Sequence, residues 1–162
     1  MNIFIPSKFL AYSLLIALLG SLNANAAATL KIVNAWIPEA PPGANVMAGY
    51  MEIQNNSNKA IDIVSINSDA FASIEMHRSM ESDGFAKMLP QKTLRIRAND
   101  KLVLKSGSYH LMLIKPIKWF RHGNTVELTF TLSNNESQTI SISIKKNKKQ
   151  TMKCAAGKCG AQ

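Results

Sequence analysis

Residues 126–132 read VELTFTL and residues 139–144 read TISISI, and both segments alternate between apolar and polar side chains. A period of two places one set of side chains on each face of a β-strand. Asn134 and Asn135 lie between the two segments and favour a turn. The pair therefore predicts two neighbouring strands that each bury one face in a core.

The same period continues through most of the chain, and Gly, Pro, Asn and Asp residues interrupt it at short intervals. No segment shows a helical period over 11 or more residues. Many short strands separated by turns predict an all-β, single-domain sandwich or barrel. The strands are expected at residues 30–37, 47–54, 60–66, 73–77, 85–89, 93–97, 102–105, 109–114, 126–132 and 139–144.

The N-terminal segment, residues 1–26, predicts a secretory signal peptide. Lys8 precedes an apolar run at residues 9–22, which is shorter than the about 20 residues of a membrane span. We expect cleavage after Ala26 or Ala28, with an uncleaved membrane anchor as the alternative. No cysteine follows the run, so no lipoprotein anchor is expected, and the mature chain should lack stable membrane insertion and work outside the cytoplasm.

The chain carries 19 basic and 10 acidic residues, a formal net charge of +9. Residues 28–144 keep 12 basic and 10 acidic residues, or only +2, because six lysines lie from residue 145 onward. The body therefore lacks the basic stripe with interleaved aromatics that nucleic-acid binding requires, and no nucleic-acid partner is expected. We divide the chain into the signal peptide, a domain at residues 29–144 and a flexible basic tail at residues 145–162.

Histidines and methionines form the pattern that carries chemistry. His77, Met88, His110 and Met112 follow the spacing H-x10-M-x21-H-x-M, for which chance predicts about one match in ten thousand such chains. His110 and Met112 share one face of their strand, opposite Leu111 and the core. Thioether sulfur is a soft, neutral ligand that favours Cu(I), and imidazole suits copper generally.

With this spacing the chain resembles the periplasmic copper chaperones of the PCuAC type. The resemblance covers residues 31–144 and includes the phrases NAWI (34–37), EMH (75–77), GFAKM (84–88) and YHLM (109–112). It implies a cupredoxin-like Greek-key β-sandwich or barrel, a periplasmic location, and His77, Met88, His110 and Met112 as the Cu(I) ligands. It also implies delivery of copper to an acceptor during cytochrome c oxidase assembly, either an oxidase subunit or a thioredoxin-fold copper protein.

Each of these residues has an ordinary alternative. A lone histidine is usually a surface or satisfied strand residue, and a lone methionine usually fills a core. Outside the motif we expect Met76 in the core, Met47 and Met51 in core or edge packing, and His122 in a turn. Met80 is a weaker candidate for a place near the site, and Glu75 either orients a ligand histidine or is solvated.

The tail departs from the family pattern because it contains Met152, Cys154 and Cys159. These sulfur atoms could form an accessory Cu(I) site, since nearby lysines favour the thiolate. A local disulfide or an inert tail are the alternatives.

The leading functional hypothesis is a Cu(I) carrier and not an enzyme, because no catalytic triad spacing, P-loop or dinucleotide motif occurs. The alternatives are a thiol–disulfide oxidoreductase that acts on a copper-protein partner through the tail cysteines, and a copper storage or tolerance protein. An exported sandwich that binds a protein partner, with coincidental His and Met residues, is the remaining alternative.

Overall fold

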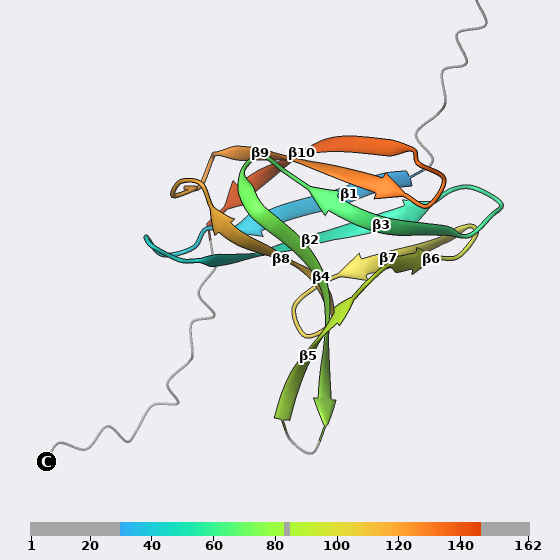
Figure 1. The fold of residues 1–162 in the computed structure, drawn as a ribbon, viewed down its shortest axis with the longest axis horizontal. Coiled ribbons are helices and arrows are strands. Elements are labelled where there is room, and N and C mark those ends of the chain that lie inside the picture. Colours follow the sequence, from blue (N-terminus) through green and yellow to red (C-terminus); the bar gives the residue numbers. More distant parts are fainter. Residues whose placement is uncertain (1–29, 83–84, 147–162) are drawn as a thin grey trace, which may run out of the picture.

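A computed structural model describes residues 30–82 and 85–146, and all of its regular structure is β-strand (Figure 1). Each expected strand is present, so the all-β prediction is confirmed. Within the described ranges no helix has the length and apolarity needed to cross a membrane. The strands are β1 Leu30–Pro38, β2 Val46–Asn55, β3 Ile61–Asn67, β4 Phe71–Ser82, β5 Phe85–Gln91, β6 Leu94–Ile96, β7 Asp100–Leu104, β8 Tyr109–Pro116, β9 Thr125–Leu132 and β10 Ser137–Lys145.

The strands form one curled sheet in the order β5-β4-β8-β7-β2-β1-β10-β9-β3-β6, with an additional β8–β2 pairing. The curl brings the far end of the order back, so that β6 contacts β7 and β3 contacts β4. Its pairs are antiparallel except β1–β10 and β7–β8. The result is a nearly closed sandwich with β8 flanked by β4 on one side and by β2 and β7 on the other.

The core follows from the alternation in the sequence. In β9, Val126, Leu128, Phe130 and Leu132 are buried, and the residues between them are more exposed. Apolar side chains that leave water in this way supply the main favourable free energy of folding. The predicted core positions Met47, Met51 and Met76 are confirmed, since all three are buried.

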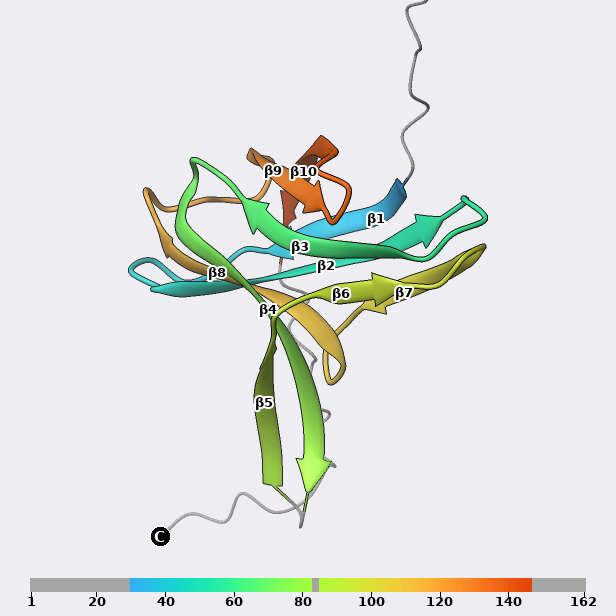
Figure 2. The same ribbon diagram turned by 45° about the vertical axis from the view of Figure 1, so that its right-hand side comes forward.

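The fourth strand is longer than expected, because β4 covers residues 71–82 and not only residues 73–77. Its first part pairs with β8 inside the sandwich, whereas its second part pairs only with β5. This β4–β5 hairpin projects away from the body (Figure 2). A projecting hairpin buries no face, so the apolar alternation that identifies a strand is missing there.

Candidate metal centre

The two motif histidines face each other across the β4–β8 pair. His77 and His110 are direct cross-strand partners, although 33 positions separate them in the sequence. Their ring centroids are 5.9 Å apart and the ring planes are inclined by 43°. The opposite strand face carries Met76 and Leu111, which belong to the core.

Both histidine side chains lie outside the main core, as the alternation predicts, but they are not on an open surface. His77 is 9% exposed and His110 is 7% exposed. A buried polar side chain requires hydrogen-bond partners or a ligand, because leaving water without them costs free energy. The partners of the four ring nitrogens therefore decide what these residues can do.

Glu75 determines which nitrogen of His77 is available. Its Oε2 lies 2.8 Å from His77 Nε2, and a carboxylate can only accept, so Nε2 carries the proton and donates. The lone pair is then on Nδ1, which is buried and has no hydrogen-bond partner. A buried acceptor of this kind has a free lone pair that can coordinate a cation. Of the two roles expected for Glu75, the orienting one matches this contact.

His110 is oriented by the turn that precedes β8. Its Nδ1 lies 3.1 Å from the carbonyl oxygen of Ser108, which can only accept, so Nδ1 donates and Nε2 keeps the lone pair. The same carbonyl also accepts a hydrogen bond from the backbone N–H of Ser79 at 3.0 Å. Gly107, with φ of +76°, gives the turn a backbone conformation that other residues rarely adopt. The turn therefore holds the imidazole by a backbone contact.

The two motif methionines approach the same region from different strands. Met112 is half-buried and is paired with Glu75 on one side and Ala48 on the other. It follows His110 by two positions in β8 and therefore shares a strand face with it. Met88 is the cross-strand partner of Ser79 and lies on that face of the hairpin, with 60% of its surface exposed.

One hollow of about 280 Å³ connects these side chains. Met88, His110 and Met112 all line it, and the ring of His77 lies beside that of His110 in a tilted arrangement. The structure thus brings three of the four predicted ligands to one hollow and places the fourth beside them. The remaining lining residues are Val46, Met47, Ala48, Tyr50, Ser79, Ser106 and Gly107.

The other candidate residues lie elsewhere. Met80 is the partner of Lys87 on the opposite face of the hairpin from Met88, so it does not approach this hollow. His122 lies in a turn, as predicted. The predicted signal peptide and the tail residues Met152, Cys154 and Cys159 fall outside the described residues.

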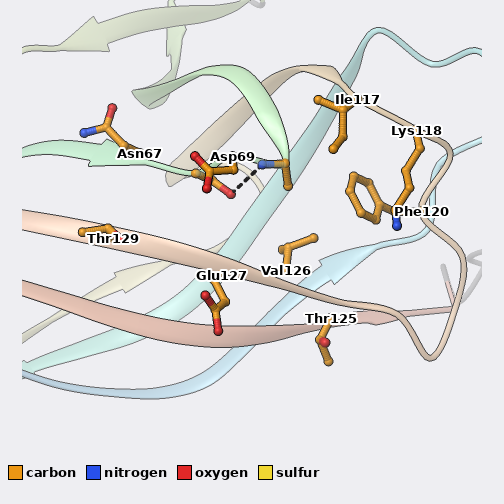
Figure 3. A pocket seen from close by; sticks show the side chains of 11 residues that line it. Asn67, Asp69, Ile117, Lys118, Phe120, Thr125, Val126, Glu127 and Thr129 are labelled. Atoms are coloured by element: carbon orange, nitrogen blue, oxygen red, sulfur yellow. Dashed lines mark hydrogen bonds between the residues drawn. The ribbon is translucent and has the colours of Figure 1, made fainter.

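A larger hollow of about 380 Å³ lies beside the β3–β4 turn (Figure 3). Asp69, Glu127 and Lys118 line it together with uncharged residues, and no histidine or methionine is among them. Its chemistry therefore differs from that of the hollow beside β8.

The fold and this cluster define a class: a cupredoxin-like β-sandwich with a histidine–methionine hollow beside β8. Residues 30–144 match the family described as LpqE-like lipoproteins, and the chain belongs to that family. The resemblance to PCuAC-type domains that the motif suggests is confirmed by the solved structures.

The copper-bound PCuAC domain from PmoF2 is 17% identical, with a TM-score of 0.64 over 75% of this chain and 97% of that domain. The Cu(I) form of DR1885 from Deinococcus radiodurans is 25% identical, with a TM-score of 0.58 over 78% of this chain and 84% of that protein. Protein RP573 of Rickettsia prowazekii is 29% identical over 126 residues, 74% of this chain and 68% of that protein. The two solved structures confirm the cupredoxin-like fold, and both are copper-bound.

Proposed function

We propose that this protein is an exported carrier of Cu(I), which binds the ion through His77, Met88, His110 and Met112. The observation that carries the proposal is the pairing of two oriented imidazoles, one with a buried, unpartnered Nδ1, beside a hollow lined by two thioethers. In this arrangement His77 contributes Nδ1 and His110 contributes Nε2. Copper is the cargo of such a protein.

The ligand chemistry supports a cuprous ion. Four neutral ligands leave the charge of the ion uncompensated, which disfavours Cu(II) relative to Cu(I), and thioethers are poor ligands for hard cations. Zinc sites use His, Cys and carboxylate ligands, and no group of three such residues in the described ranges could hold a metal ion. The Cu(I) form of DR1885 provides a neighbour that binds the same ion.

The different exposure of the four ligands supports release by ligand exchange. His77 and His110 are buried, whereas Met88 is exposed on the projecting hairpin. An acceptor can therefore reach the ion from the side of Met88 and displace that thioether first. We assign delivery to a periplasmic acceptor during cytochrome c oxidase assembly on the family resemblance, and the LpqE-like lipoprotein description supports a place in the cell envelope.

The direct test is anaerobic titration with Cu(I) against a chromogenic chelator. The titration is made with Cys154 and Cys159 replaced by Ser, so that the tail thiolates do not contribute. In that background we expect one tightly bound ion, and none after Met88→Leu/Met112→Leu is added, with little change in thermal stability. Met80→Leu is the matched control, because Met80 is exposed on the same hairpin but on its other face. Retained stoichiometric binding in the double variant would refute the ligand assignment.

The tail residues Met152, Cys154 and Cys159 form a separate proposal, an accessory Cu(I) site. A Cys154→Ser/Cys159→Ser variant should then bind fewer ions than the wild type under reducing conditions. If the variant binds as many Cu(I) ions as the wild type, the tail holds no copper and the site at His77, Met88, His110 and Met112 accounts for all binding. Turnover of a disulfide substrate that depends on these cysteines would support the oxidoreductase alternative instead.

A further inference from the structure

One end of the sandwich combines uncompensated positive charge with exposed apolar side chains. It lies where β1, β8 and β10 end, at the left of Figure 1. We call it the basic end and define it by the cations Lys115, Lys118, Arg121, Lys145 and Lys146 and by the apolar residues Ile117 and Trp119.

Backbone contacts hold these separate segments together. The N–H of Lys115 donates to the carbonyl of Asn45 at 2.7 Å, and the N–H of Glu39 donates to the carbonyl of Lys145 at 2.8 Å. Trp119 Nε1 donates to the carbonyl of Ala40 at 3.0 Å, which fixes the indole against the loop after β1. The cations therefore come from two regions far apart in the sequence but lie at one end of the fold.

The positive charge at this end is not neutralised internally. Among the described residues, none of the four lysines forms an ion pair. The nearby carboxylates are Glu39 in the adjoining loop and, at the neighbouring hollow, Asp69 and Glu127. Figure 3 shows Lys118 beside Phe120, on the far side of that hollow from both acidic side chains.

The apolar part of the basic end has the composition of a membrane interface. Ile117 is 69% exposed and Trp119 is 42% exposed. The guanidinium carbon of Arg121 lies 4.0 Å from the centroid of the indole ring, a cation–π contact. Tryptophan favours the boundary between lipid headgroups and acyl chains, and lysine stems can lie along apolar surface while the ammonium stays in water.

We propose that the basic end docks the protein on a bilayer of anionic phospholipid. Five cations that form no ion pair among the described residues complement lipid phosphates, and Ile117 and Trp119 supply side chains that can enter the headgroup region. An acidic protein would complement the same charge, but the centre of a protein interface is depleted of charged residues, whereas Ile117 and Trp119 alternate with Lys115, Lys118 and Arg121. The net charge of residues 28–144, only +2, conceals this surface, because Lys115, Lys118 and Arg121 are offset in that sum by acidic residues and Lys145 and Lys146 lie beyond it.

Docking in this orientation would keep the histidine–methionine hollow beside β8 near the membrane but uncovered. Lys115 follows His110 by five positions in β8, which is about 17 Å along a strand. An acceptor embedded in the same membrane would then reach the exposed Met88 by diffusion along the membrane instead of through bulk solution.

The test uses metal-free protein purified from the periplasmic fraction, so that its outcome does not depend on the copper site. Binding to vesicles of phosphatidylcholine with about one-third phosphatidylglycerol is measured by co-sedimentation at low and physiological salt. A Lys118→Gln/Lys146→Gln variant should bind about 30-fold more weakly, since each cation near an anionic surface contributes roughly a fivefold effect. The matched control is Lys59→Gln/Lys92→Gln, which removes the same charge from exposed positions elsewhere and should change binding by less than about twofold.

The apolar contribution has a separate readout. Brominated lipids should quench Trp119 fluorescence, and Trp119→Phe should remove most of that quenching, whereas Ile117→Ser should weaken binding severalfold. The proposal is overturned if wild type binds neutral and anionic vesicles equally, or if both lysine pairs have the same effect. Binding that survives these substitutions but is lost on removal of residues 147–162 would also overturn it. Binding to poly-glutamate but not to anionic vesicles would assign the basic end to an acidic protein and reject the membrane.

Discussion

Glu75 offers the sharpest test of how the metal centre is organised. Its carboxylate lies 2.8 Å from His77 Nε2 and is the one hydrogen-bond partner of that ring among the described residues. Replacing Glu75 with Leu preserves the size of the side chain but removes the acceptor. The proton of His77 can then move to Nδ1, which takes away the lone pair that we assign to copper.

The expected loss of affinity follows from the environment of this contact. Removing an outer hydrogen-bond partner of a ligand histidine weakens metal binding by about 10- to 100-fold. The side chain of Glu75 is half exposed, so water competes for the contact, and we expect the lower end of this range, about tenfold or roughly 1.4 kcal/mol. Glu75→Gln keeps an amide oxygen that can accept from Nε2, and we expect it to recover most of the affinity.

The assay is competition for Cu(I) with a chromogenic chelator, combined with ¹⁵N chemical shifts of the imidazole nitrogens in the metal-free protein. The shifts should report a proton on Nε2 of His77 in the wild type and a mixture of tautomers in Glu75→Leu. Glu81→Leu is the matched control, since Glu81 is also exposed and lies on the same face of β4. Unchanged affinity and an unchanged tautomer in Glu75→Leu would refute the orienting role.

Three further substitutions test the scaffold. Leu111→Ala removes a fully buried side chain behind His110 and should lower the free energy of unfolding by about 2–5 kcal/mol in denaturant titrations; a loss below 1 kcal/mol would contradict the assigned core. Asn55→Ala removes a buried amide whose Nδ2 donates to the carbonyls of Lys59, Ile96 and Arg97. It should lower the free energy of unfolding by about 1–3 kcal/mol in the same assay, and no loss would show that those contacts are unimportant. Gly107→Ala forces a side chain into the left-handed region and should cost about 1 kcal/mol and weaken Cu(I) binding through the displaced Ser108 carbonyl; full affinity by chelator competition would argue that this turn does not position His110.

The sequence predicted the strands because each strand shows its alternation within its own segment. It predicted the motif residues because their spacing along the chain can be read without a structure. Alternating apolar residues such as Val126, Leu128 and Phe130 predict a half-buried strand from that segment alone. The projecting part of β4 was missed because a hairpin without a buried face carries no such alternation. The spacing of His77, Met88, His110 and Met112 identified a candidate set before any geometry was known.

The state of each side chain in that set was decided by tertiary contacts. The β4–β8 register places His77 opposite His110, and a register shift of one residue would have moved one imidazole to the core face. Glu75 and the Ser108 carbonyl then select which nitrogen of each ring is free.

For the basic end too, the sequence shows the residues and the tertiary structure decides that they meet. Its lysines are visible in the sequence at residues 115–118 and 145–146, but only the meeting of the ends of β1, β8 and β10 makes them one surface. Periodicity is a property of neighbouring residues, whereas register, burial and charge clustering depend on which distant segments pair. The amino-acid sequence by itself therefore determined the strands and the candidate ligands of this protein, and the folded sheet decided which atoms meet.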